Sequence, residues 1–502
     1  MERISTAPNT IAEVLDDALV SHPDAPAIEA ASGVWSYRQL DDRARRAAGA
    51  LWSLGVRPGD RVAACLPNDL GIVGAFHGAQ RIGAVWVGIG EALTAEEQHD
   101  LHRMCRPRIT LTGPRYEAVT EGVVTEHEWA ALLDDDLTAP PVHLDPDAPA
   151  GIAFTSGTSG RPKAVVHSQR NLLLPGAVLT AIRGWGTELR KGDSFPLTIL
   201  NLMVLSTLLT AQAGGCAVIM DRRDADGVAE WISTRRVTVW NGAPAQLFDL
   251  AKRPDLDLRS LVEVWSGGSD TPDALRHAFA AAHGLVPRAT YGLTEAPTVV
   301  SIDPPGAEWR TGTSGHVLPQ YDVAAYDDEG RRLPPGEIGE LRLTGATTGD
   351  WANRWTPLLG YWEDGTVNPA DPGPFPTGDI GSVDENGVLT VLDRKKLVII
   401  RGGANVYPLE VERVLGSHPA VTKAAVYGVP DDRLGHRVGA IIESGRREID
   451  FDSIEDHCRR TLSTYKVPEV WTRVDALPVN AMGKIQRAGL PELAAAHRQA
   501  TS

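Results

Sequence analysis

A loop rich in glycine and hydroxyl residues, at positions 154–163, constrains this chain more than any other stretch; it reads Phe-Thr-Ser-Gly-Thr-Ser-Gly-Arg-Pro-Lys. Its glycines let the backbone approach an anion, its hydroxyls add donors, and Lys163 supplies a mobile positive charge. It is not a Walker A motif, because Lys163 follows Pro162 and precedes Ala164. Taken alone it could be a surface turn, and residues 311–315 form a similar string with no following lysine. The pattern indicates a polyphosphate-binding loop that needs support from the rest of the chain.

Short motifs follow the loop in order along almost the whole chain. They are Ser266-Gly267-Gly268 with Pro272, Tyr291-Gly292-Leu293-Thr294-Glu295, Gly336-Glu337-Ile338-Gly339-Glu340-Leu341, Thr377-Gly378-Asp379, Asp393-Arg394-Lys395-Lys396, Gly403-Ala404-Asn405-Val406-Tyr407-Pro408 with Glu410, and Asn480-Ala481-Met482-Gly483-Lys484. Each motif is weak alone, but chance does not place all of them in one order. Together they resemble the signatures of the adenylate-forming superfamily, which holds acyl-CoA synthetases, stand-alone adenylation domains and beetle luciferases. The chain is most similar to a stand-alone acyl-CoA synthetase.

Length and charge indicate a multidomain enzyme that acts on small molecules. The 502 residues exceed what one hydrophobic core usually serves, so we expect two or more domains. A net charge of −16 disfavours nucleic-acid and membrane partners, which need a basic face. The cysteines lack Cys-x-x-Cys spacing and are expected to be buried or incidental thiols. Because residues 1–10 contain no apolar secretion signal, we expect a cytoplasmic enzyme, either a monomer or a homodimer.

Alternating helix and strand patterns predict an α/β fold of layered sheets covered by helices. Apolar residues repeat at helical spacing from Leu40 to Leu54, behind the candidate cap Ser36, and a strand is expected after Gly59. Residues 195–220 carry no charge and are long enough to suggest a membrane-spanning helix. Pro196 and Gly214-Gly215 interrupt this segment, so we predict a buried helix over 202–213 and a buried strand over 216–220.

The pattern of expected helices and strands changes at Asp393 to that of a compact unit, and we place a domain boundary there. Residues 1–392 are predicted to form a large N-terminal adenylation domain with the ATP and acyl pockets. Residues 393–502 are predicted to form a small, mobile C-terminal α+β domain, with helices near 410–415 and 454–462 and a strand near 424–429.

Activation of a carboxylate by ATP requires an acid oxygen to attack the α-phosphorus while pyrophosphate leaves. The resemblance implies that Tyr291 stacks on adenine, Thr294 touches the α-phosphate, and Asp379 accepts both ribose hydroxyls. Glu295 is a carboxylate suited to Mg²⁺. Taken singly, Asp379 could be a turn residue and Glu295 a solvated loop acid. The predicted nucleotide-binding residues are Thr155, Ser156, Gly157, Thr158, Ser159, Gly160, Lys163, Gly268, Ser269, Thr290, Tyr291, Gly292, Asp379 and Arg394.

Lys484, in a Met-Gly-Lys turn, is the predicted catalytic lysine, together with Thr294 and Glu295. A lysine can bring a point charge to the acid oxygen and the α-phosphate, although this position could also be an ordinary surface lysine. In the superfamily the small domain rotates after adenylation, and the resemblance implies that Asp393 is the hinge. It also implies that Arg394 contacts the ribose and that Gly402 and Gly403 border a CoA channel. Leu397 departs from the acidic residue of many relatives, which leaves the contacts after rotation less defined.

The resemblance places an acyl pocket at Ile199, Asn201, Met203, Trp240, Asn241 and Gly267. Many acyl-CoA synthetases have Pro-Leu-Phe-His where this chain has Pro196-Leu197-Thr198-Ile199, and Gln169 replaces another frequent histidine. The region also lacks the aspartate that pairs with an amino-acid ammonium group. We therefore expect a monocarboxylic acid with an apolar or aromatic body. Asn201 and Asn241 could recognise a polar substituent or could be satisfied core amides.

Three functions fit the sequence. The first is an acid:CoA ligase that uses ATP, Mg²⁺ and CoA and works through acyl-AMP. The second is an adenylating enzyme that passes the acyl group to a carrier protein or to an amine or other nitrogen nucleophile. The third is a non-enzymatic nucleotide sensor, which the presence of Lys163, Glu295, Asp379 and Lys484 disfavours. A Ser-His-Asp hydrolase is disfavoured because no Gly-x-Ser-x-Gly elbow occurs. The acid, the acceptor, the oligomeric state and the pathway stay open.

Overall fold

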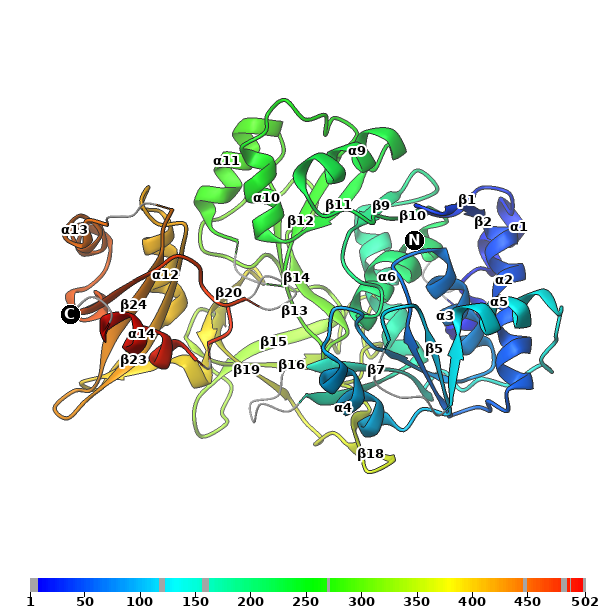
Figure 1. Cartoon of the computed structure of the whole chain (residues 1–502). Coiled ribbons are helices and arrows are strands. Elements are labelled where there is room, and N and C mark those ends of the chain that lie inside the picture. Colours follow the sequence, from blue (N-terminus) through cyan, green and yellow to red (C-terminus); the bar gives the residue numbers. More distant parts are fainter. Residues whose placement is uncertain are drawn as a thin grey trace.

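The strands in the described part of the chain form four sheets (Figure 1). The computed structural model describes residues 8–116, 122–155, 162–268, 271–445, 449–479, 485–487 and 489–499. The first sheet runs in the order β14 (Thr298–Ile302), β13 (Arg288–Leu293), β12 (Glu263–Ser266), β11 (Val239–Gly242), β9 (Arg190–Asp193), β10 (Cys216–Ile219), β1 (Pro26–Ala30) and β2 (Gly33–Ser36). The third runs β18 (Thr366–Pro369), β17 (Gly360–Glu363), β8 (Lys163–Ser168), β7 (Pro149–Thr155), β4 (Val85–Gly88), β3 (Arg61–Cys65), β5 (Ile109–Thr112) and β6 (Val123–Thr125).

The two smaller sheets continue the chain toward its C-terminus. The second sheet is antiparallel, in the order β15 (Tyr321–Tyr326), β16 (Gly339–Gly345), β19 (Phe375–Val383) and β20 (Leu389–Arg394). The fourth contains β22 (Ala404–Val406), β21 (Ile399–Arg401), β24 (Gly435–Glu443) and β23 (Lys423–Asp431), with β25 (Val470–Val474) paired to β24. In Figure 1 this last sheet and its helices form a separate unit beyond β20, coloured orange to red.

Helices cover the sheets of the large unit and the small one. Those before the second sheet are η2 (Ile11–Glu13), α1 (Asp16–Ser21), α2 (Tyr37–Ser53), α3 (Leu70–Arg81), α4 (Ala95–Cys105), α5 (Glu126–Asp134), α6 (Gln169–Arg183), α7 (Leu200–Met203), η3 (Val204–Leu208), α8 (Leu209–Ala213), α9 (Ala225–Arg235), α10 (Pro244–Ala251) and α11 (Asp273–His283). Those after it are η4 (Lys395–Leu397), α12 (Pro408–Gly416), α13 (Phe451–Thr461), η5 (Thr464–Lys466) and α14 (Leu490–Gln499).

The main core lies where the first and third sheets meet around α2 and α3. Ile28 of β1, Val62 of β3 and Leu51 of α2 belong to one buried cluster there. Helices α9, α10 and α11 lie together over another face of the first sheet (Figure 1), and Trp240 and Phe279 fill that interface. The small unit has its own core. These layers match the predicted α/β architecture of a large unit and a smaller α+β unit.

Several local predictions are confirmed by the structure. Ser36 caps α2, because its side chain accepts from the Gln39 backbone N–H while the Gln39 side chain binds back to Ser36. The charge-free segment folds as a buried helical run, α7, η3 and α8, followed by the buried strand β10. Among the described helices, none has both the length and the apolarity needed to cross a bilayer. All four cysteines are buried free thiols.

Parallel pairing brings several predicted site residues to one edge of the first sheet. Strands β9, β11, β12 and β13 run parallel, so their carboxyl ends share an edge. Ligands in open α/β sheets usually bind outside such carboxyl ends. Asn241, Gly267 and Thr290 lie at or next to this edge, which is why residues far apart in sequence can serve one site.

Candidate active site

A three-residue cluster joins the first and second sheets around the carboxylate of Asp379. The Tyr291 hydroxyl donates to Oδ2 of Asp379 at 2.6 Å, and Nε of Arg394 lies 2.8 Å from Oδ1. Asp379 and Arg394 face each other on the paired strands β19 and β20. Burial, followed by the neighbouring Asp379 charge, raises the pKa of Tyr291 well above its usual value, so the phenol stays protonated and donates. The structure therefore brings together the three residues predicted for adenosine.

Glu295 lies in the turn that connects β13 to β14, within electrostatic range of two positive side chains. Burial raises the pKa of its carboxyl group, while the Arg394 and Lys163 charges act in the opposite direction. Gly292 makes this turn possible, because a Cβ there would lie 2.0 Å from the Thr298 carbonyl oxygen. Thr294 directly precedes Glu295 in the same turn. The turn thus presents a half-buried carboxylate to a basic environment.

Lys163 begins β8 and faces Thr155, the last residue of β7, across the sheet. The two ends of the predicted phosphate loop therefore lie side by side. Residues 156–161, with the predicted Ser156, Gly157, Thr158, Ser159 and Gly160, lie outside the described residues, as does Ser269. Lys163 Nζ lies 5.1 Å from the centre of the Tyr361 ring, a cation–π distance.

Sequence reasoning missed Tyr361, which lies on β17 opposite Val165 of β8. Burial and the nearby Glu295 charge raise the pKa of Tyr361 to about 12. Its ring therefore contacts the predicted phosphate lysine and its hydroxyl lies within the electrostatic range of the predicted metal ligand. The aromatic pair Tyr361-Trp362 is visible in the sequence, but the pairing of β17 with β8 across a long separation is not.

The predicted acyl-pocket residues divide between the sheet edge and the core. Gly267 abuts Thr290, since a Cβ at Gly267 would lie 2.1 Å from the Thr290 Oγ1. Asn241 faces Asp193 of β9. Ile199 precedes α7 and Asn201 lies within it, and both are partly exposed. Gly268 is described and has a positive φ of 84°.

Two of the pocket assignments need correction. Met203 and Trp240 have no exposed surface, and each packs into a hydrophobic cluster. Trp240 points to the opposite face of β11 from Asn241, because successive strand residues alternate between faces. We therefore treat Met203 and Trp240 as core residues. Gln169 is also structural: its amide nitrogen donates to Gln80 at 2.9 Å and its oxygen accepts from the Ile11 backbone.

A buried ion pair on β9, next to Asn241 of β11, was not predicted from the sequence. Nζ of Lys191 is 2.5 Å from Oδ2 of Asp193, and both side chains are almost wholly buried. Burial raises the pKa of Asp193, while Lys191 and the Asn241 amide act against that rise. Asn241 faces Asp193 on the neighbouring strand, but Oδ1 of Asp193 has no hydrogen-bond partner among the described residues. Both interpretations of the Asn241 amide, a contact for a substrate group and a core amide, therefore stay open.

The predicted hinge residue Asp393 connects β20 to the small unit through hydrogen bonds. Its Oδ1 accepts from the Arg394 backbone at 2.7 Å, and its Oδ2 accepts from the Leu409 backbone at 2.6 Å, in the first turn of α12. A carboxylate at a helix N-terminus satisfies an otherwise unpaired N–H and interacts favourably with the helix dipole. Burial raises the pKa of Asp393. Asp393 therefore holds the first turn of α12 against the end of β20.

Lys484 lies outside the described residues, but the segment that follows it is described from Ile485 to Arg487. Nη2 of Arg487 lies 2.7 Å from Oε2 of Glu412, and the other carboxylate oxygen of Glu412 accepts from the Val426 backbone at 2.7 Å. This pair fixes Arg487 to α12 and β23.

Gly402 and Gly403 both have positive φ, 58° and 87°, and open space surrounds the Cβ position of Gly403. Backbone conformation, rather than crowding by described residues, thus favours glycine there.

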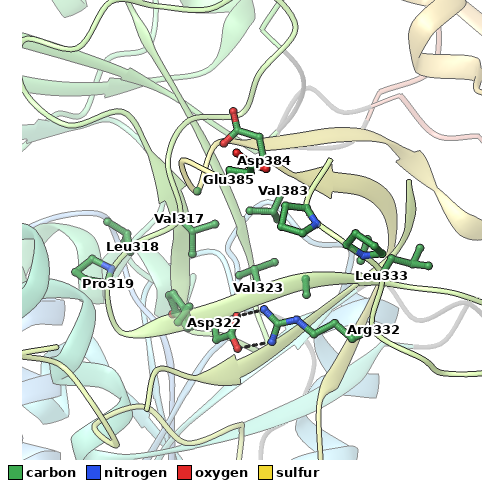
Figure 2. Close-up of a pocket in the computed structure, with 16 residues that line it drawn as sticks. Val317, Leu318, Pro319, Asp322, Val323, Arg332, Leu333, Val383, Asp384 and Glu385 are labelled. Carbon is green, nitrogen blue, oxygen red and sulfur yellow. Dashed lines mark hydrogen bonds and ion pairs between the residues drawn. The ribbon is translucent and has the colours of Figure 1, made fainter. Parts of the chain in front are cut away.

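A pocket of about 370 Å³ lies apart from these residues, between β15 and the turn after β19. Figure 2 shows the Asp322–Arg332 ion pair along this pocket, with N–O distances of 2.7 and 2.9 Å. None of the predicted site residues lines it. We assign no role to this pocket in the predicted reaction.

The AMP-binding enzyme family matches residues 15–350, and its C-terminal domain matches residues 410–484. The chain belongs to the AMP-binding enzyme family. It is 32% identical over 485 residues to the long-chain-fatty-acid–CoA ligase FadD13 of Mycobacterium tuberculosis, covering 91% of this chain and 92% of that protein. Two solved structures are also similar over nearly the whole chain. The anthranilate CoA ligase AuaEII in complex with anthranoyl-AMP has a TM-score of 0.87 at 26% identity, covering 100% of both chains. The amide bond synthetase McbA from Marinactinospora thermotolerans has a TM-score of 0.82 at 27% identity, covering 96% of this chain and 99% of that one.

The predicted membership of the adenylate-forming superfamily and the predicted ligase class are thereby confirmed.

Proposed function

We propose that this chain is an AMP-forming acid:CoA ligase that acts on a monocarboxylic acid with an apolar or aromatic body. The observation that supports it most directly is the cluster in which Tyr291 and Arg394 hold the Asp379 carboxylate next to the Glu295 turn. A diol-binding carboxylate, an aromatic ring and a basic environment for phosphates are the groups that ATP needs. The family membership adds the reaction class.

In the first half-reaction an oxygen of the substrate carboxylate bonds to the α-phosphorus of ATP, and the bond to pyrophosphate breaks. Asp379 would receive the ribose hydroxyls, which compete with its present partners Tyr291 and Arg394. Lys163 and Thr155 would hold the β and γ phosphates, and Thr294 would contact the α-phosphate. Lys484 would bring its ammonium group to the oxygen atoms that carry charge during transfer. Positioning and charge neutralisation supply most of the rate in such transfers.

Glu295 is the residue that would hold Mg²⁺ with the nucleotide. Among the described residues no group of three or more His, Cys, Asp or Glu side chains could enclose a metal ion. A single carboxylate suits Mg²⁺, which is commonly held by one or two carboxylates, substrate phosphates and water. Bound there, Mg²⁺ would neutralise phosphate charge as pyrophosphate leaves.

In the second half-reaction the CoA thiol attacks the acyl carbon of acyl-AMP, and AMP leaves as the thioester forms. We propose a domain boundary at Asp393, with rotation of residues 393–502 between the half-reactions. The Asp393 bonds to the Arg394 and Leu409 backbones support this position, because they join the end of β20 to the first turn of α12, where the large and small units meet. Gly402 and Gly403 would then border the CoA thiol arm.

A second candidate function is transfer of the acyl group to an amine instead of to CoA. The similarity to the amide bond synthetase McbA supports it. Because both functions share the adenylation half-reaction, the site described above does not separate them. A carrier protein is a further possible acceptor, and the choice among the three depends on the acceptor side of the site.

Mass spectrometry of the products tests the proposal. The purified protein is incubated with Mg²⁺, ATP, CoA and a panel of aliphatic, alicyclic and aromatic acids, and acyl-AMP and acyl-CoA are followed together. We expect an acyl-CoA product with at least one acid. Accumulation of acyl-AMP in the presence of CoA would overturn the ligase assignment and favour an amine or carrier-protein acceptor, which added amines would then identify. Formation of neither product with any acid would count against the proposed acid class.

A further inference from the structure

A hydrogen bond between the third and first sheets reaches the backbone directly before Glu295. Nε2 of His167, on β8, lies 2.7 Å from the carbonyl oxygen of Thr294, in the turn after β13. A carbonyl oxygen only accepts, so Nε2 carries the ring proton and donates it. The imidazole therefore forms a hydrogen bond to the turn that carries Glu295, the predicted metal ligand.

One face of β8 as a whole points toward this turn. Every second residue of a strand lies on the same face, so one face of β8 carries Lys163, Val165 and His167. Lys163 acts on the Glu295 charge at one end of that face, and His167 binds the Thr294 carbonyl at the other. Tyr361, opposite Val165, also lies within electrostatic range of Glu295. Of these side chains His167 contacts the turn through a hydrogen bond, while Lys163 and Tyr361 act on it through the Glu295 charge.

Packing alone does not explain a histidine at this position. His167 has no exposed surface, and its Nδ1 atom is buried without a hydrogen-bond partner among the described residues. Burial lowers the pKa of His167 to about 4, against the effect of the Thr294 carbonyl, so the ring is neutral near pH 7. An apolar side chain of similar size would fill the space without leaving a polar nitrogen unpaired in the core. The bond from Nε2 to the turn is what the imidazole adds.

We propose that His167 is a positioning residue that fixes the Thr294-Glu295 turn, so that the Glu295 carboxylate is held ready for Mg²⁺ bound with ATP. The inference rests on the proposed function, because it takes Glu295 as the metal-binding carboxylate. Groups that orient a metal ligand from behind strengthen metal binding, and their loss commonly costs about 10- to 100-fold in metal affinity. His167 would act in this way through the backbone of the turn.

Nucleotide binding with and without metal tests the inference and needs no knowledge of the acid. Isothermal titration calorimetry measures the affinity for ATP in Mg²⁺ and in EDTA, and their ratio is the gain in affinity due to Mg²⁺. We expect His167→Leu to reduce this gain about 10-fold. His167→Gln keeps an N–H donor at similar reach and should restore most of it. His167→Asn is polar but too short to reach the Thr294 carbonyl, so it should behave like the leucine variant and replaces it if that variant does not fold.

A matched control is Tyr37→Phe, which removes another buried bond from a side chain to a backbone carbonyl. The Tyr37 hydroxyl donates to the Gly215 carbonyl oxygen at 2.6 Å within the large unit, and none of the predicted site residues takes part. This variant should lower the unfolding temperature and leave the Mg²⁺ gain unchanged.

An unchanged Mg²⁺ gain in His167→Leu or His167→Asn overturns the inference. Equal losses in the glutamine and asparagine variants overturn it too, because the donor would then not matter. If the wild-type protein binds ATP but shows no gain from Mg²⁺, the metal-binding role of Glu295 fails and the inference with it. A wild-type protein that binds no ATP in either condition overturns the proposed function itself.

Discussion

At the scale of single residues, the proposed site rests on carboxylates whose partners the structure identifies. The sequence motifs located Asp379, Glu295 and Asp393, because short motifs record local chemistry. They did not reveal that Tyr291 and Arg394 share the Asp379 carboxylate, or that Asp393 binds the first turn of α12. Those contacts depend on which strands pair and on where a distant helix begins. Trp240 shows the opposite error: both faces of β11 are buried, so the residue pattern alone did not show that Trp240 belongs to the hydrophobic cluster with Phe279.

Asp379→Asn tests the ribose assignment. The variant keeps the size of the side chain but loses the charge and one acceptor. A hydrogen bond to a charged group contributes roughly 1.5–3 kcal/mol, so we expect ATP to bind about 10- to 100-fold more weakly by calorimetry. Asp384→Asn is the control, because Asp384 lies just beyond β19 and its carboxylate binds the backbone of its own turn. Wild-type ATP affinity in Asp379→Asn, with a fold verified by circular dichroism, would contradict the assignment.

Lys484→Ala separates the two half-reactions. Loss of one charge-stabilising donor should slow acid-dependent pyrophosphate release about 10²-fold or more. Thioester formation from supplied acyl-AMP should continue, because the lysine is proposed to act only before rotation. Stopped-assay measurements of each half-reaction check both parts, and Lys423→Ala, on β23 outside the predicted site, is the control. Equal slowing of both half-reactions would assign Lys484 a different role.

At the scale of elements, prediction succeeded where the signal is local and failed where it is not. The Ser36 cap and the buried run of residues 195–220 are readable from spacing and from glycine positions. The π-helical segment η3 within that run is not. Thr207 and Thr210 hydroxyls bind backbone carbonyls at 2.9 and 2.8 Å there, an alternative to regular helical bonding that the apolar pattern conceals. The antiparallel pairing of β17 with β8 is likewise a long-range contact without a local sign.

The pairing of β17 with β8 makes a prediction of its own at this scale. Tyr361→Leu removes the ring beneath Lys163, while Tyr361→Phe keeps it. A cation–π contact contributes about 0.5–2 kcal/mol, so the leucine variant should raise the KM for ATP by about 2- to 30-fold in a pyrophosphate exchange assay. The phenylalanine variant should stay close to wild type.

The neighbouring residue supplies the control for this experiment. Trp362 points to the other face of β17, where its ring contacts Arg61 at 4.9 Å. Trp362→Leu should therefore lower stability without changing the KM for ATP. If Tyr361→Phe is as damaging as Tyr361→Leu, the hydroxyl near Glu295 matters more than the ring.

At the scale of the whole molecule, the sequence predicted the layered α/β architecture and a smaller C-terminal unit. It did not predict the order of strands within the sheets, because that order depends on crossovers between distant segments. The order matters for the proposed site: the parallel strands β9, β11, β12 and β13 collect Asn241, Gly267 and Thr290 at one edge. The third sheet then approaches this edge through Lys163 and His167 of β8. The site is thus a product of two sheets that local patterns describe only separately.

The core between those two sheets also predicts how the stability of the large unit depends on pH. His77 of α3 is buried there, and its Nε2 atom has no hydrogen-bond partner among the described residues. Burial, with a smaller effect of the Arg81 charge, lowers the pKa of His77 to about 3. In the unfolded chain a histidine binds a proton below about pH 6.5. Between about pH 6.5 and pH 3 the unfolded state therefore binds more protons, and acidification through this window destabilises the fold.

His77→Gln measures this contribution. When the pH is lowered from 7 to 5, the free energy of unfolding of the wild type should fall by about 2 kcal/mol more than that of His77→Gln, because glutamine does not bind a proton. Urea unfolding of both proteins at the two pH values checks it, and the comparison at pH 7, where histidine is mostly neutral in both states, reports chiefly the packing change. The midpoint of the wild type should shift further on acidification than that of the variant. Equal shifts would mean that His77 takes up its proton at a similar pH in the folded and unfolded chains, so that its environment is wetter or more polar than the packing of α3 indicates.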